Sequence, residues 1–156
     1  MELAIIIMTI ILDQISKYWI QINPSLHSHI EIIPNFLYIT YVKNTGAAWS
    51  MLSNQTLFLI IISIIETIVL IYFLVKYMKK KGKENLLYRI SLSLMIGGAI
   101  GNLIDRIQLG YVRDFIDTYP FGYNFPVFNI ADSALSIGVV LLIIQFLLEE
   151  RKEKGL

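Results

Sequence analysis

Hydrophobic residues fall into four long runs, separated by segments in which polar residues gather. The runs cover about residues 3–22, 57–75, 86–106 and 130–148. A helix rises about 1.5 Å per residue, so even the 19 residues of 57–75 reach about 29 Å, enough to cross the hydrocarbon core of a bilayer. The pattern therefore predicts four transmembrane helices.

The segment between the first two runs has a different pattern. From about 30 to 50 it is rich in Ile, Tyr, Phe, Val and Thr, and Pro34-Asn35 forms a turn signal within it. β-branched and aromatic residues bounded by turn signals favour short strands. We therefore predict a mainly α membrane protein, a single domain over 1–156, with four transmembrane helices and a small extracytoplasmic β-sheet between helices 1 and 2.

Composition supports the membrane assignment and excludes several classes of site. The chain is 56% hydrophobic and only 16% charged, with a mean hydropathy of +0.64, which is too apolar for an ordinary soluble domain. A net charge of +1 gives no indication of a nucleic-acid partner. The absence of cysteine excludes disulfides and a cysteine nucleophile, and two histidines offer no conventional zinc site. We predict no metal and no cofactor.

Lys and Arg residues predict the orientation of the helices. Nine of the 13 lie in residues 76–89 or in the tail after residue 150, and the positive-inside rule places both segments in the cytoplasm. Both termini are then cytoplasmic, and residues 23–56 and 107–129 lie outside. The first run has neither the basic start nor the small-residue cleavage site of a secretory signal peptide, so we expect a retained helix.

Aspartates concentrate at the predicted outer surface. Four of the five in the chain fall between Asp105 and Asp132, the others being Asp114 and Asp117. Carboxylates are costly near hydrocarbon, so such a cluster is by default a functional-site hypothesis. Without a candidate Ser-His or Cys-His pair, the remaining chemistry is paired-carboxylate catalysis. One carboxyl of a close pair keeps a proton and polarises a carbonyl, while its ionised partner activates water.

Charged pairs on the helices also have structural interpretations. Asp13 and Lys17 are four residues apart and can form an ion pair, with Lys17 extending toward the membrane surface. Asp105 and Arg106 are expected to form an ion pair that fixes the outer end of the third helix.

Small and polar residues near the helix ends are similarly open to two interpretations. Residues 44–48, Asn-Thr-Gly-Ala-Ala, form either a turn or a surface that an extended ligand approaches closely. Gly97 and Gly101 form a G-x-x-x-G motif, which allows helices to pack closely. Asn129 is a good N-cap for the fourth helix, with Asp132 in its first turn.

These motifs together resemble lipoprotein signal peptidase, the type II signal peptidase of bacteria, which is an intramembrane aspartic protease. The resemblance covers nearly the whole chain, with five motifs in the family's order: DQISK at 13–17, NTGAA at 44–48, GGAIGNLIDR at 97–106, VRDF at 112–115 and FNIAD at 128–132.

The resemblance implies a function and a set of site residues. The family removes signal peptides from prolipoproteins, cleaving on the N-terminal side of a cysteine that carries a diacylglyceryl group. The catalytic pair falls on Asp114 and Asp132. Further positions that support the site or bind substrate and inhibitor are Asp13, Lys17, Asn44, Gly46, Asn102, Asp105, Arg106 and Asn129.

The resemblance also implies partners and a location. Expected partners are prolipoproteins, membrane lipids and the inhibitors globomycin and myxovirescin, and a monomer suffices for the chemistry. The expected location is the bacterial cytoplasmic (inner) membrane, with the active site near the extracytoplasmic face. Arg113 departs from the small apolar residue of many relatives, and either faces lipid headgroups or lowers the pKa of Asp114. Asp117 is not expected to be catalytic, and Glu66 has no family role.

Two other classes of function remain as alternatives. A proton- or ion-coupled carrier would use Asp13, Glu66 and Asp105 as a relay, although carriers often show inverted repeats with broken helices and none is found here. A purely structural membrane subunit is the second alternative, and it predicts that no single aspartate is needed for an activity.

Overall fold

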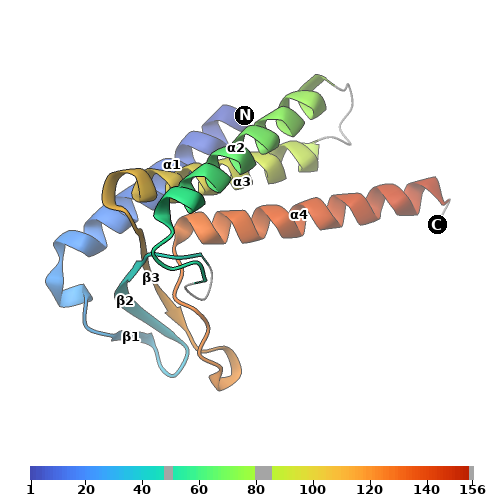
Figure 1. Cartoon of the computed structure of the whole chain (residues 1–156). Coiled ribbons are helices and arrows are strands. Elements are labelled where there is room, and N and C mark those ends of the chain that lie inside the picture. The colour runs from blue at the N-terminus through green and yellow to red at the C-terminus, as the bar shows by residue number, and fades with distance from the viewer. Residues whose placement is uncertain (48–50, 80–85, 155–156) are drawn as a thin grey trace.

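The computed structural model describes residues 1–47, 51–79 and 86–154, which form four long helices with a small sheet at one end (Figure 1). The helices are α1 (Glu2–Ile22), α2 (Thr56–Lys79), α3 (Leu86–Leu109) and α4 (Ile130–Glu153). Each is long and apolar enough to cross a membrane. The predicted fold class is therefore confirmed, and the chain is a multi-pass membrane protein.

Several helices extend past the apolar runs that predict them. α2 continues to Lys79 and α3 to Leu109, because backbone hydrogen bonding continues through polar residues where no breaker intervenes. Gly110 ends α3: its φ is +80°, and its N–H donates to the Arg106 carbonyl at 3.1 Å. A glycine in the left-handed region is a common helix terminus.

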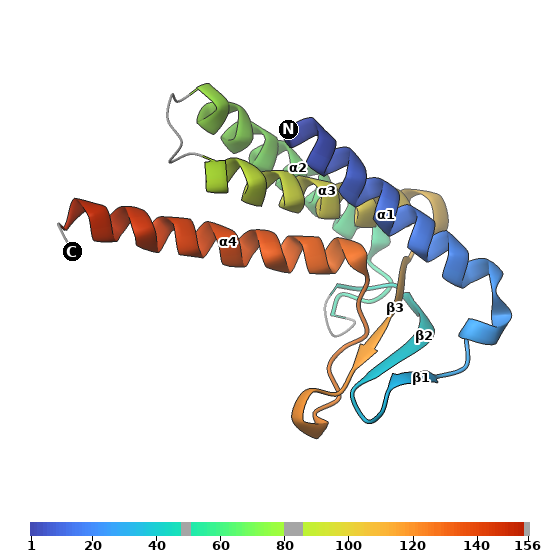
Figure 2. The ribbon, with the colours of Figure 1, turned by 180° about the vertical axis from the view of Figure 1, so that it is seen from behind.

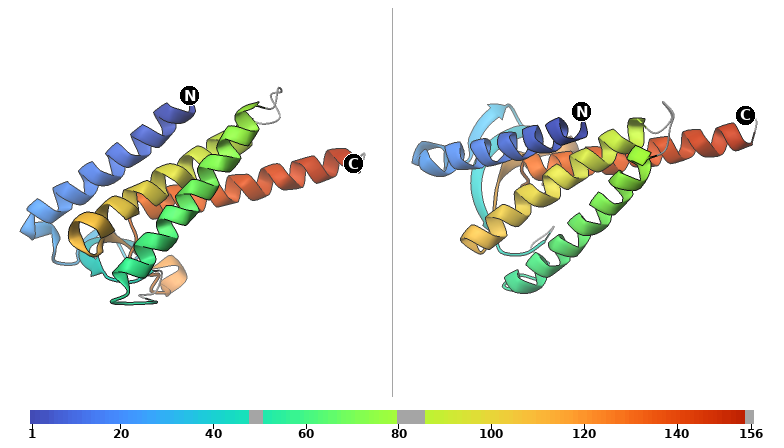
Figure 3. Two further views of the ribbon diagram at one scale, coloured as in Figure 1. Left: turned by 45° about the horizontal axis from the view of Figure 1, so that its top comes forward. Right: turned by 90° about the horizontal axis from the view of Figure 1, so that it is seen from above.

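α3 is the central helix of the bundle and packs against α1, α2 and α4 (Figure 3). Its apolar stretch is 56% buried, against 22% for each of the other three helices. Leu92, Ile96 and Ala99 of α3 form a buried core with Leu70 and Leu74 of α2. The outward faces of α1, α2 and α4 remain apolar, as expected of helices that contact lipid.

Glycines on α3 allow it to pack closely against α1 and α4. A Cβ on Gly97 would lie 2.7 Å from Thr9 of α1, and a Cβ on Gly98 would lie 2.4 Å from the Ala131 carbonyl oxygen of α4. Gly101 is equally close to Asp13, at 2.7 Å. The packing role predicted for the G-x-x-x-G motif is thus confirmed.

The sheet has three antiparallel strands in the order β1-β2-β3, namely β1 (Ile30–Ile33), β2 (Leu37–Asn44) and β3 (Val112–Thr118). The predicted turn joins β1 to β2, with Asn35 at φ +58°. Residues 48–50 of the predicted β-rich segment lie outside the described residues. β3 was not predicted; it follows α3 in the chain and pairs Asp114 with Val42 of β2.

The sheet and the chain termini lie at opposite ends of the bundle (Figure 2). Short 3₁₀ turns at Pro24–Leu26 and Pro120–Gly122 connect the sheet to its surroundings. Lys80, Lys81 and Lys83, which contributed to the predicted orientation, lie outside the described residues.

Candidate active site

A cavity of about 1170 Å³ lies between α2, α3 and α4, and residues of β2, β3 and 123–128 border the end nearest the sheet. α4 diverges from α1 toward its C-terminus (Figures 1 and 3). Asp114 and Asp132 both line this cavity, together with Asn44, Asn102 and Arg106. Five residues predicted for the site therefore face one space.

Asp114 is presented by β3 and held by two side-chain amides. Asn44 Nδ2 donates to Asp114 Oδ2 at 2.9 Å, and Asn129 Nδ2 donates to Asp114 Oδ1 at 2.7 Å. Burial and the nearby negative charge of Asp132 raise the pKa of Asp114 to about 7, although the two amides act in the opposite direction. Asp114 can therefore hold a proton near neutral pH.

Asp132 lies in the first turn of α4, within the predicted cap. Asn129 Oδ1 accepts from the Asp132 N–H at 2.9 Å, while Asp132 Oδ2 accepts from the Asn129 N–H at 3.1 Å. This reciprocal arrangement is a capping box, which fixes the carboxylate at the start of the helix. Asn102 Nδ2 donates to the other oxygen, Asp132 Oδ1, at 2.7 Å. The predicted capping role of Asn129 is confirmed.

Asn129 links the two aspartates directly. Its side chain is fully buried and contacts Asp114 through Nδ2 and the backbone of Asp132 through Oδ1. The orientation of this amide is therefore fixed by both neighbours. A displacement of β3 relative to α4 would break at least one of these bonds.

Lys17 lies behind the cavity at the centre of a buried charge cluster. Its Nζ is 2.8 Å from Asp13 Oδ2 and 3.5 Å from Asp105 Oδ2, and it donates to Asn102 Oδ1 at 2.9 Å. The predicted Asp13–Lys17 pair is confirmed, but the outward extension of Lys17 is wrong, because its side chain is fully buried. Two carboxylates and an amide oxygen thus take the place of the water molecules that would solvate an exposed ammonium group.

Asp13 also reaches the start of α4. Its Oδ1 accepts from the Ala131 N–H at 2.9 Å, so the carboxylate satisfies one of the unpaired donors of that helix. Through Asn102, Lys17 is connected to the Asp132 carboxylate. α1 thus supports the site without lining the cavity.

The expected Asp105–Arg106 ion pair is wrong. Asp105 pairs instead with Arg113, whose Nη2 lies 2.7 Å from Asp105 Oδ1 and whose Nε lies 3.1 Å from Oδ2. Neighbours on a helix point in different directions, so Arg106 turns to the cavity and donates to the Gly46 carbonyl at 3.1 Å. Gly46 in turn donates to Asn44 Oδ1 at 2.9 Å.

Neither interpretation offered for Arg113 holds. Its side chain is buried and reaches α1, where Gln21 accepts at 2.8 Å and Gln14 at 3.1 Å. The pKa of Asp114 is raised by burial and by Asp132, and the groups that lower it are Asn44, Asn129 and Lys17 rather than Arg113. Arg113 therefore anchors the strand that carries Asp114. Its departure from the family pattern indicated that the position was unusual, but not that it had this role.

Gln14 and Gln21 were not among the predicted site residues. Gln14 Nε2 contacts both Asp13 Oδ2, at 3.0 Å, and Asp105 Oδ1, at 3.1 Å. Both amides lie in a helix predicted to cross the membrane, where a polar side chain needs a protein partner. Their presence could therefore have indicated that this helix supports the site.

The alternative carrier relay is not continuous. Asp13 and Asp105 share Lys17, whereas Glu66 lines the cavity from α2 and interacts electrostatically with Arg106. Asp117 lies outside the residues that line the cavity, and its Oδ2 is 3.2 Å from His29 Nδ1. In the described part of the chain, no group of three His, Cys, Asp or Glu side chains could hold a metal ion.

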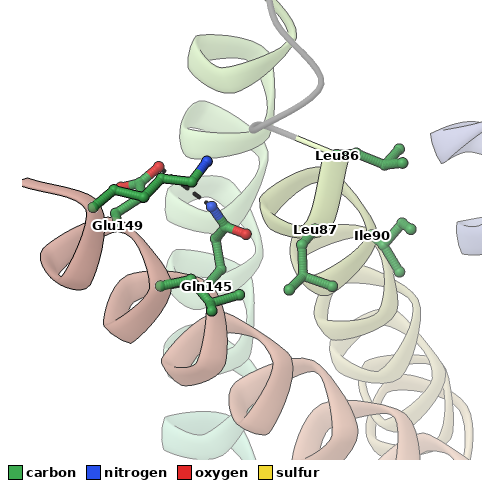
Figure 4. Close-up of a pocket in the computed structure, with 7 residues that line it drawn as sticks. Leu86, Leu87, Ile90, Gln145 and Glu149 are labelled. Atoms are coloured by element: carbon green, nitrogen blue, oxygen red, sulfur yellow. Dashed lines mark hydrogen bonds between the residues drawn. The ribbon is translucent and has the colours of Figure 1, made fainter. Parts of the chain in front are cut away.

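A second, smaller cavity of about 310 Å³ lies at the other end of α3 and α4 (Figure 4). Leu86, Leu87 and Ile90 form its apolar side, and Gln145 lies opposite. Of the described residues that line it, only Glu149 carries a carboxylate, and that group accepts from the Tyr88 hydroxyl at 2.8 Å. It lacks the paired carboxylates of the first cavity.

Comparisons with known proteins agree with the sequence motifs. A family model described as signal peptidase (SPase) II matches residues 5–148. Two solved bacterial membrane enzymes, determined by the in meso method at 2.3 Å and 1.9 Å resolution, have the same fold. The first is 45% identical and covers 97% of this chain and 90% of its own, with a TM-score of 0.87; the second is 46% identical and covers 94% and 92%, with a TM-score of 0.81.

Proposed function

The chain belongs to the signal peptidase II family, and we propose that Asp114 and Asp132 are its two catalytic aspartates. The family is one of aspartic proteases, so the protein is an aspartic endopeptidase that removes signal peptides from lipoprotein precursors. The resemblance identified in the sequence is confirmed. The geometry of the larger cavity supports the choice of these two aspartates over the other three.

The observation that carries this assignment is the convergence of two carboxylates on one cavity. Asp114 and Asp132 come from different elements, line the same space and are both bonded to Asn129. The other aspartates do not share this arrangement, since Asp13 and Asp105 are neutralised by Lys17 and Arg113 behind the cavity wall.

The raised pKa of Asp114 supports a division of roles. Protonated Asp114 donates to the carbonyl oxygen of the scissile bond, and ionised Asp132 removes a proton from the attacking water. The tetrahedral intermediate then collapses: Asp132 gives its proton to the leaving amine as the C–N bond breaks, and a hydroxyl of the intermediate returns a proton to Asp114. Placing both groups in fixed geometry supplies much of the rate enhancement.

The supporting residues act through these two. Asn44, Asn102 and Asn129 orient the carboxylates through hydrogen bonds. Arg106 lies in the cavity wall, where it can bind substrate carbonyls and where Gly46 holds its guanidinium. The cluster of Asp13, Lys17 and Asp105 fixes the helices on which the site is built.

The cavity provides a place for an apolar substrate segment. Aliphatic side chains of both α2 and α4 line it, among them Leu59 and Leu135, so the signal peptide lies between these helices with its cleavage point beside the aspartates. The diacylglyceryl chains of the substrate cysteine then remain in hydrocarbon. Globomycin and myxovirescin are expected to occupy the same cavity, and a monomer is sufficient because one chain contributes both aspartates.

The site is assigned to the outer face of the bacterial inner membrane. The sheet and the aspartates lie at the end of the bundle opposite the termini, which the basic residues place in the cytoplasm. A precursor exported through the membrane would meet the cavity on that side.

The test uses purified protein in detergent with a synthetic prolipoprotein that carries a diacylglyceryl-cysteine. Asp114→Asn and Asp132→Asn are each expected to abolish cleavage, because Asn keeps the size of the side chain but neither holds nor accepts the proton. The matched control is Asp117→Asn, which alters a buried aspartate outside the cavity and is expected to leave cleavage measurable. Full activity in either cavity variant would contradict the assignment.

A further inference from the structure

The cavity contains one carboxylate that the proposed reaction does not use. Leu59, Ile62, Ser63 and Glu66 of α2 line the cavity. Their spacing of three, one and three residues is that of one helix face, so Glu66 follows the others inward. At about 1.5 Å per residue, it lies about 15 Å below the start of α2 at Thr56.

The cavity residues around Glu66 include two serines and a small alanine. Ser63 lies on the preceding turn of α2, and Ser136 lines the cavity from α4, one turn beyond Asp132. Ala99 of α3 lies at about the same depth as Glu66, counted at about 1.5 Å per residue from the outer end of its helix. Between Asp132 and Glu66 the cavity therefore offers hydroxyl oxygens as well as the Glu66 carboxylate.

The Glu66 carboxylate lacks a donor at bonding distance. Within the described ranges no hydrogen bond or ion pair reaches this exposed side chain. The positive charge of Arg106 acts on it, but the hydrogen bond that Arg106 makes goes to the Gly46 carbonyl. A polar group at membrane depth requires a partner, and a carboxylate in a transmembrane helix indicates function by default. Because this group faces the cavity, a bound substrate can supply the missing donor.

We propose that Glu66, with Ser63 and Ser136, forms a polar subsite that binds a serine or threonine hydroxyl in the membrane-spanning part of the signal peptide. This inference rests on the proposed position of the substrate in the cavity. A hydroxyl fits better than an ammonium group, because it donates to the carboxylate and accepts from a serine without bringing a full charge into hydrocarbon. Glu66 is thus a specificity-determining residue.

The subsite also fixes the register of the substrate. An apolar segment makes no directional contacts and can slide with little change in energy, whereas a single hydrogen bond selects one position. Counted along each helix at about 1.5 Å per residue, Glu66 lies about 15 Å from the start of α2 and Asp132 about 3 Å from the start of α4, so we take about 12 Å as the separation along the substrate. The preferred hydroxyl therefore lies about four to eight residues before the cleaved bond, according to whether the segment is extended or helical.

The experiment moves one serine through a substrate. A series of diacylglyceryl-modified peptides has an otherwise all-leucine apolar segment, with serine at each successive position, and kcat/KM is measured with the full-length protein. One or two adjacent positions are expected to raise kcat/KM about three- to tenfold, the effect of one hydrogen bond in a membrane. Glu66→Leu is expected to remove this preference, while Glu66→Gln, whose carbonyl still accepts, keeps part of it.

Controls separate this proposal from the catalytic one. Ile65→Leu changes the neighbouring, outward-facing residue of α2 and should keep the preference. Ser136→Ala should reduce it, so the result does not depend on one replacement. A wild type without a preferred position, or a preference that survives Glu66→Leu, would overturn the subsite. An equal loss of kcat/KM for every peptide in Glu66→Leu would also overturn it, because that result would indicate an effect through Arg106. Cleavage of the all-leucine peptide tests the catalytic proposal separately.

Discussion

Asn129 does more at the candidate site than begin a helix. One amide is bonded to Asp114, to the backbone of Asp132 and, at 3.2 Å, to Asn102. Three elements are therefore held in register by a side chain whose donors and acceptor are all used. A sequence motif can identify such an asparagine as a helix cap, but the bond to Asp114 depends on a strand located earlier in the chain.

The pH dependence of cleavage should report the proton on Asp114, whose pKa is about 7. Because the protonated form is the proposed donor, kcat/KM should fall as pH rises above about 7. Asn44 donates to the carboxylate and so holds its pKa down. Asn44→Ala should therefore move the alkaline limb to higher pH, whatever its effect on the maximal rate. A limb that stays in place or moves to lower pH would contradict this role of Asn44.

Arg113 provides a test of stability at a single buried charge. Arg113→Met leaves Asp105 with Lys17 as its remaining cation, and breaking a buried pair costs about 3 kcal/mol. Thermal unfolding in detergent should show a clearly lower midpoint. The control is Lys154→Met, which breaks a pair with Glu150 that is largely exposed and should leave the midpoint unchanged. Equal midpoints for both variants would mean that Arg113 is not an anchor.

Among the elements, the helices were predictable and the third strand was not. An apolar run that is long enough to cross a bilayer has few alternatives to a helix, so hydropathy alone predicts the four spans. β3 contains Arg113, Asp114 and Asp117, and both of its faces are largely buried, so its sequence lacks the alternation of a half-buried strand. Its pairing with β2 joins positions about 70 residues apart, as between Asn44 and Asp114, and local patterns contain no such information.

The contact of α3 with α4 predicts different results for two glycines. In Gly98→Ala the new Cβ would meet the Ala131 backbone, and α4 would have to move at a cost of about 1 to 3 kcal/mol. Since Asp132 is next to Ala131, both thermal stability and cleavage should fall. Gly110→Ala meets no atom within 4 Å, but its positive φ disfavours a side chain, at about 1 kcal/mol. It should lower stability while sparing cleavage, and the reverse ranking would argue against tight α3–α4 packing.

For the whole molecule, the two ends of the bundle have distinct assigned compartments. Because the chain lacks cysteine, single cysteines can report this orientation without background. Phe121→Cys, near the sheet, should react with a membrane-impermeant maleimide on intact spheroplasts, because Phe121 is fully exposed. Lys154→Cys should react only after the membrane is permeabilised. Labelling of Lys154→Cys on intact cells would reverse the proposed topology.

The shared charge cluster of α1 and α3 has a consequence for biosynthesis. These are the two least apolar of the four spans; α1 carries Asp13 and Lys17, and α3 carries Asp105. When α1 leaves the ribosome, only its internal ion pair offsets the cost of its charges, because the rest of the cluster has not yet been made. We expect α1 to remain beside the insertion machinery until α3 follows. Assembly of the charge cluster then becomes the step that commits the nascent chain to the bilayer.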